Sequence, residues 1–126
     1  MTKPNTKPVV LLIYANTGVA LENLEPETDA IESHLKASGL CDVKIVPAAT
    51  LADVVTAIND PTIRDRISIV HYAGHSHGEG IQLQIRDSLT QGETAHMRGL
   101  AQVLGTLPHL RLLLLMAVRR VSKYLT

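Results

Sequence analysis

Residues 67–80 read Ile-Ser-Ile-Val-His-Tyr-Ala-Gly-His-Ser-His-Gly-Glu-Gly, and this stretch decides the fold class. Its mostly apolar, β-branched first six residues predict a strand over 67–72 that is buried on both faces. The strand runs into a segment rich in glycine and histidine. Gly74 is expected to give the chain a sharp exit, so that His75 projects from the carboxyl end of the strand. An imidazole has a pKa near neutrality, which suits a general base at that position.

On both sides of this stretch, predicted strands alternate with predicted helices along the chain. Further strands are predicted at residues 8–14, 43–46, 81–85 and 110–115, and the strict alternation of 81–85 marks it as half of a hairpin. Helices are predicted around residues 26–38, from the cap residue Thr50 to residue 58, and over 95–104. This order predicts an open, mostly parallel α/β sheet with helices on both faces, in three layers. Ligands and catalytic groups in such sheets collect at the carboxyl ends of the strands.

The composition predicts one packed domain and favours neither nucleic acid nor a membrane surface as its partner. The 126 residues are 45% hydrophobic and 19% charged, enough apolar content for one packed domain. Twelve basic and twelve acidic residues balance, so nothing favours nucleic acid or a membrane surface as a partner. No signal peptide or membrane-length apolar run is seen, and a soluble cytoplasmic protein is expected. Phe and Trp are absent, which predicts an aliphatic core.

The sequence contains residues that could form three other kinds of site: a metal site, a phosphate-binding turn and a reactive thiol. His71, His75 and His77 would share a face if the strand continued, and with Glu79 they resemble a zinc ligand set, but Gly74 and the next glycine are expected to break the geometry. We therefore expect no metal. Asn16-Thr17-Gly18 resembles a phosphate-binding turn, but it lacks a second glycine. No cofactor is therefore expected. Cys41, the only thiol, precedes the second strand at the wrong end of the sheet for His75, and a structural role is expected for it.

The chain resembles the CHAT domain, a caspase-like cysteine peptidase fold related to caspases, separases and gingipains. The most specific match is Ile-Val-His-Tyr-Ala-Gly-His at 69–75, followed by Glu-Gly-Ile-Gln-Leu at 79–83. Weaker similarity is carried by residues 11–16, 21–31, 50–54, 99–101 and 110–115. Intact relatives are implied to hydrolyse peptide bonds in prokaryotic stress, defence or cell-death signalling, often fused to TPR or other interaction modules.

The resemblance implies roles for named residues. His75 would be the general base, Gly74 and Ser76 would shape the site and the oxyanion contacts, and Asn16 and His77 would border the substrate cleft. The family's nucleophile is a cysteine after the fourth strand, typically in Asn-Gly-Cys. Here the corresponding residues are Met116-Ala117-Val118, so Val118 occupies the nucleophile position and the chain is expected to be inactive.

A shift of reading frame would explain the altered motif. The bases AAT GGC TGT GCG TCG encode Asn-Gly-Cys-Ala-Ser, and read one base later they encode Met-Ala-Val-Arg-Arg, the residues at 116–120. The expected organisation is a disordered leader over 1–7, a partial CHAT-type domain over 8–115 whose C-terminal third is missing, and an out-of-frame tail over 116–126. The alternatives are ordinary divergence into a pseudoenzyme, or an end introduced in preparing the chain.

The sequence leaves two rival functions and predicts two kinds of partner. The rivals are a non-catalytic protein-interaction module and, more weakly, a flavodoxin-like nucleotide or flavin binder. The expected partners are a peptide or protein and a second copy of the chain, because a nearly uncharged strand edge from Leu110 to Leu115 would be free to pair. Val118, Val121 and Leu125 recur at helical spacing and predict a short amphipathic helix in the tail.

Overall fold

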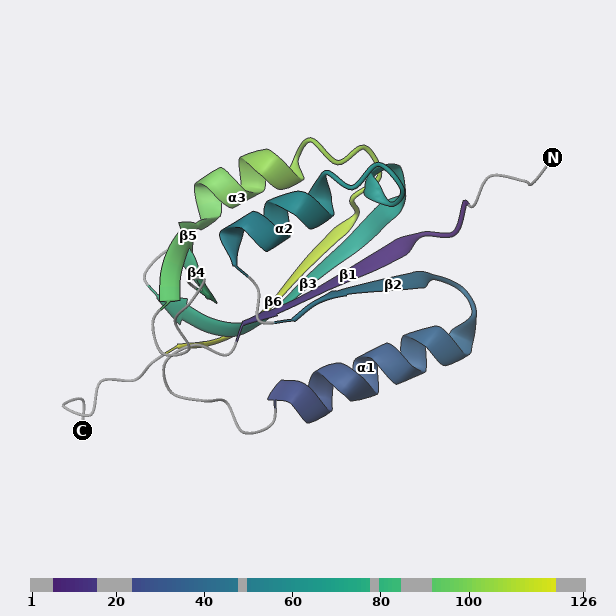
Figure 1. The fold of residues 1–126 in the computed structure, drawn as a ribbon, viewed down its shortest axis with the longest axis horizontal. Coiled ribbons are helices and arrows are strands. Elements are labelled where there is room, and N and C mark those ends of the chain that lie inside the picture. The colour runs from purple at the N-terminus through teal and green to yellow at the C-terminus, as the bar shows by residue number, and fades with distance from the viewer. Residues whose placement is uncertain (1–5, 16–23, 48–49, 78–79, 85–91, 120–126) are drawn as a thin grey trace.

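The computed structural model describes residues 6–15, 24–47, 50–77, 80–84 and 92–119 (Figure 1). The elements in chain order are β1 (Val9–Ala15), α1 (Leu24–Ser38), β2 (Asp42–Val46), α2 (Leu51–Ile58), a 3₁₀ turn (Arg64–Arg66), β3 (Ile67–His77), β4 (Gly80–Gln84), β5 (Gly92–His96), α3 (Met97–Leu104) and β6 (Leu112–Arg119). Within the described residues, no helix is long and apolar enough to cross a membrane.

Four strands form a parallel sheet in the order β2-β1-β3-β6. β4 and β5 add an antiparallel extension, because β4 pairs with the last residues of β3 and β5 pairs with β4. The predicted open, mostly parallel α/β sheet is confirmed.

Helices cover both faces of this sheet. α1 lies on one face, and α2 and α3 lie together on the other (Figure 1). The main apolar cluster joins alternate residues of β1 and β3 to Val54 and Ile58 of α2 and Leu104 of α3. The expectation of a purely aliphatic core is wrong at one position, since Tyr72 is the largest of the fully buried side chains.

Local signals set the limits of α2 as predicted. The Thr50 hydroxyl accepts a hydrogen bond from the Asp53 backbone N–H at 3.1 Å. The Asp53 carboxylate accepts one from the Thr50 backbone N–H at 3.2 Å, which completes the reciprocal cap. The helix ends at Ile58, directly before the Asn-Asp-Pro sequence.

Several predicted boundaries need correction. β3 continues through Gly74 to His77, so Gly74 does not end the strand. Residues 95–96 belong to β5 and not to the third helix, because they pair with β4. The last strand begins at Leu112 and extends to Arg119, so Val118 lies in a strand and cannot belong to a tail helix; the remainder of that predicted helix lies outside the described residues.

Candidate functional site

The connections of the sheet define where a site is expected. From β1 the chain passes through α1 to β2 on one side, and from β3 it passes through α3 to β6 on the other side. The direction of winding therefore reverses between β1 and β3. In open α/β sheets the crevice beyond the carboxyl ends of two such strands is the usual place for a ligand. Here β1 ends at Ala15, which pairs with Gly74 of β3, and β3 continues through His75 to His77.

The strand register gives His75 a specific set of neighbours. Gly74 lies between Ala15 of β1 and Ala117 of β6. One residue further, His75 lies opposite Val118 of β6. On the other side β1 has reached the last residue of its pairing with β3, and β4 begins to pair at Ser76. His75 thus lies between the last residue of β3 that pairs with β1, Gly74, and the first that pairs with β4, Ser76.

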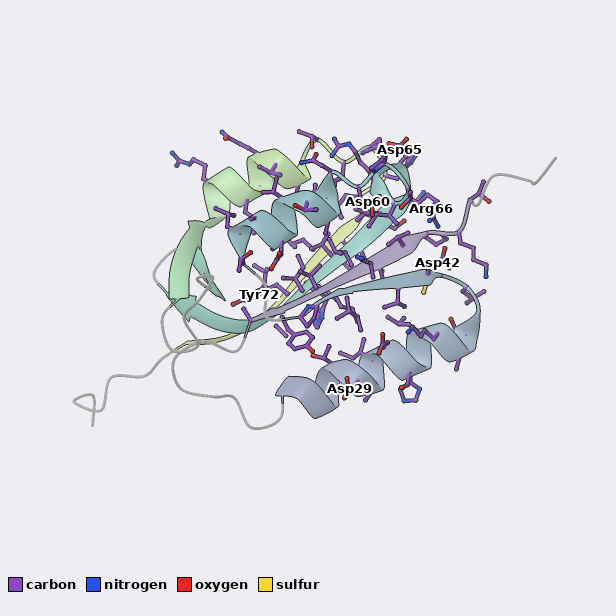
Figure 2. The ribbon with its side chains drawn as sticks, in the orientation of Figure 1. Asp29, Asp42, Asp60, Asp65, Arg66 and Tyr72 are labelled. Atoms are coloured by element: carbon purple, nitrogen blue, oxygen red, sulfur yellow. The ribbon has the colours of Figure 1, made fainter. Side chains whose placement is uncertain are left out.

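Gly74 has a packing role that the sequence did not indicate. A Cβ atom built on Gly74 would lie 2.5 Å from the Ala15 carbonyl oxygen and 2.5 Å from the Tyr72 hydroxyl. The phenol ring of Tyr72 therefore lies against the backbone of Gly74, two residues further along the same face of β3. Figure 2 shows Tyr72 toward the end of the sheet that carries β4 and β5. The glycine is needed for this close approach, and not for the predicted sharp exit.

His71 is a buried histidine on β3. It lies between Leu12 of β1 and Leu114 of β6 in the register, and only 6% of its surface is exposed. Burial lowers the pKa of the imidazole below its ordinary value of 6.5, so His71 is uncharged at neutral pH. It belongs to the packed interior of the sheet.

The structure bears on the predicted absence of a metal site through the extent of β3. β3 does not break at Gly74, so the predicted break in the strand between His71 and the two later histidines is wrong. Among the described residues, however, no group of three His, Cys, Asp or Glu side chains could hold a metal ion.

The remaining predicted site residues fall into two groups. Ser76 and His77 form the end of β3, where they pair with Ile81 and Gly80 of β4. Asn16, and the Asn-Thr-Gly turn that it begins, lie outside the described residues, as does Glu79. The sequence analysis placed its candidate residues on the last part of β3, but it did not include Ala15, Tyr72 and Ala117, which adjoin Gly74 in the structure.

Cys41 lies at the opposite end of the sheet. Its Sγ is 4.0 Å from the Leu35 carbonyl oxygen, and it lines a cavity of about 830 Å³ with Val10, Ile69 and Leu112 near the amino ends of the strands. Figure 2 shows Arg66 and Asp42 at this end, where the two side chains form an ion pair at 2.7 Å. The cavity is therefore separate from the His75 region.

Comparison of the chain with models of protein families and with curated proteins finds no match.

Proposed function

We propose that this chain is a CHAT-type, caspase-like cysteine peptidase domain in which the nucleophile position is filled by Val118, so that it does not hydrolyse peptide bonds. The proposal rests on the motif at residues 69–75 and on one structural observation. His75 and Val118, which are far apart in the sequence, are register neighbours on adjacent parallel strands. A base and a nucleophile must come this close for one to activate the other.

The chemistry explains why a valine at this position would abolish hydrolysis. In a cysteine peptidase the histidine accepts the thiol proton, and the thiolate attacks the peptide carbonyl carbon. Backbone N–H groups then stabilise the oxyanion that forms. An isopropyl side chain has no proton to give up and no electron pair to donate. The histidine then has nothing to activate, and a site of this kind could still bind an extended peptide without cleaving it.

Restoring a thiol tests whether His75 and position 118 form a catalytic pair. We would make Val118→Cys in a Cys41→Ser background, so that the introduced thiol is the only one. The rate of alkylation by iodoacetamide, measured against pH, gives the pKa of that thiol. We expect a pKa at least about one unit below the ordinary ~8.5, because a neighbouring imidazole stabilises the thiolate.

Two further variants make the result specific. Adding His75→Ala should return the thiol pKa to its ordinary range. Ala117→Cys in the same background is the matched control, since position 117 lies opposite Gly74 and not opposite His75. An unshifted pKa in folded Val118→Cys, or the same shift in Ala117→Cys, would contradict the proposed pair.

The unaltered chain should show no turnover of a peptide library. Peptide hydrolysis that is lost in His75→Ala would overturn the assignment of an inactive domain. Full peptidase activity is not expected from Val118→Cys either, because a peptidase also needs a shaped cleft and oxyanion donors.

A further inference from the structure

The two edges of the parallel sheet differ in how they are protected. β2, at one edge, has five residues, carries Asp42 and Lys44, and is followed by a proline. Short length, charge and proline are the features that keep edge strands from pairing with other chains. β6, at the other edge, has eight residues, and its first seven, Leu112 to Val118, carry no charge. Within the described residues, β6 pairs with β3 alone.

The leucines of β6 are exposed on both faces of the sheet. Leu112 and Leu114 share the α1 face by alternation and are 45% and 44% exposed, and Leu115 on the other face is 41% exposed. α1 makes most of its contacts with β2, β1 and β3. Figure 1 shows α1 running beneath β2. β6 thus combines exposed apolar side chains with a backbone edge that pairs with no other described strand.

We propose that a second copy of this chain pairs with β6, antiparallel, about a twofold axis perpendicular to the sheet. Pairing β6 with the β2 edge of the second copy would use an edge that is short and charged. It would also leave a free β6 at the far side and so grow without closing. Pairing β6 with β6 uses the unprotected edge of both copies and closes at the dimer.

Symmetry and charge restrict the register. The twofold axis keeps each face of the sheet on the same side, so residues that face each other must both be even-numbered or both odd-numbered. A register centred on Leu115 would put Arg111 opposite Arg119 of the second copy, which is unfavourable. Centring on Leu113 or Leu114 avoids this. In either case Leu114 lies opposite Leu112 or Leu114 of the second copy, so exposed leucines meet.

The expected dimer is weak and reversible. An edge of this length buries less surface than the roughly 800 Å² per partner of a standard interface. Sedimentation velocity of the whole chain over a range of concentrations should therefore show exchange between 13.7 kDa and twice that mass. A chain that stays monomeric up to about 100 µM, or one that grows steadily past the dimer, would overturn the proposal.

Charge substitutions identify the edge. Leu114→Lys should raise the dimer dissociation constant at least about tenfold, because like charges then lie close together in the pair. Leu114→Glu should do the same. An equimolar mixture of the two variants should recover the dimer. Leu112→Lys and Leu112→Glu form a second pair if the first is poorly folded by circular dichroism.

The matched control is Val55→Lys, at a residue that is 39% exposed in α2, a helix that contacts β2 at the opposite edge of the sheet. It should leave the dimer unchanged. A folded Leu114→Lys variant that dimerises as the unaltered chain does, or a mixture of Lys and Glu variants that stays monomeric, would rule out β6 as the interface.

Discussion

Gly74 has room for no more than a hydrogen atom in place of a side chain. The carbonyl oxygen of Ala15 on β1 and the phenol group of Tyr72 occupy the space that a Cβ atom would need. We predict that Gly74→Ala lowers the free energy of unfolding by about 1–3 kcal/mol, because the new methyl group must displace the phenol ring or separate β1 from β3. Urea unfolding of the two proteins measures the difference.

Gly99→Ala is the matched control for that measurement. Gly99 lies within α3, and a Cβ atom there meets nothing within 4 Å. Replacing a helical glycine by alanine should stabilise the protein by about 0.5–1 kcal/mol. If Gly74→Ala were as well tolerated as Gly99→Ala, Tyr72 would not be packed against Gly74 as described.

At the scale of single elements, the start of α2 depends on two reciprocal hydrogen bonds between Thr50 and Asp53. Thr50→Ala should lower the free energy of unfolding by about 1 kcal/mol, because the Asp53 backbone N–H then loses its partner. Thr56→Ala in the same helix is the comparison. Thr56 is exposed and lies past the cap, so its loss should be neutral or slightly stabilising. Equal effects of the two substitutions would contradict the role of the cap.

The contrast between α2 and its neighbours shows what local sequence can predict. The limits of α2 were predicted because a cap and a terminating Asn-Asp-Pro sequence lie within the segment itself. The end of β3 and the existence of β5 were not predicted, because pairing with β4 decides both. Gly-Glu-Thr-Ala-His at 92–96 has no marked β pattern of its own, and its strand state depends on a partner earlier in the chain.

The candidate site shows the same division. The sequence pointed to His75 at a strand end and, through a resemblance, to Val118. It could not show that β6 lies directly beside β3, because this depends on the direction of the crossover through α3. The strand β6 continues across residue 116, where the predicted tail begins, and ends at Arg119.

At the scale of the whole molecule, the two helical layers are bound to the sheet unequally. α2 and α3 share the main apolar cluster with the sheet. On the other face, Thr28 is the one buried residue within positions 28–38 of α1, and Ile31 and Leu35 are only half-buried. Less apolar burial implies a smaller free energy for detaching α1 from the sheet than for unfolding the whole domain.

Native-state hydrogen exchange tests this difference. We predict that the α1 amides exchange through an opening that needs less denaturant than the opening of the β1 and β3 amides, because α1 can detach while the cluster on the other face stays intact. Leu35→Ala should speed exchange in α1 and leave β3 almost unchanged. Ile58→Ala, which removes a fully buried side chain of α2, should lower the protection of both strands and reduce the free energy of unfolding by about 2–5 kcal/mol. If α1 were protected as strongly as β1 and β3, the two layers would have to unfold as one unit, and the half-buried contacts of α1 would be stronger than their exposure indicates.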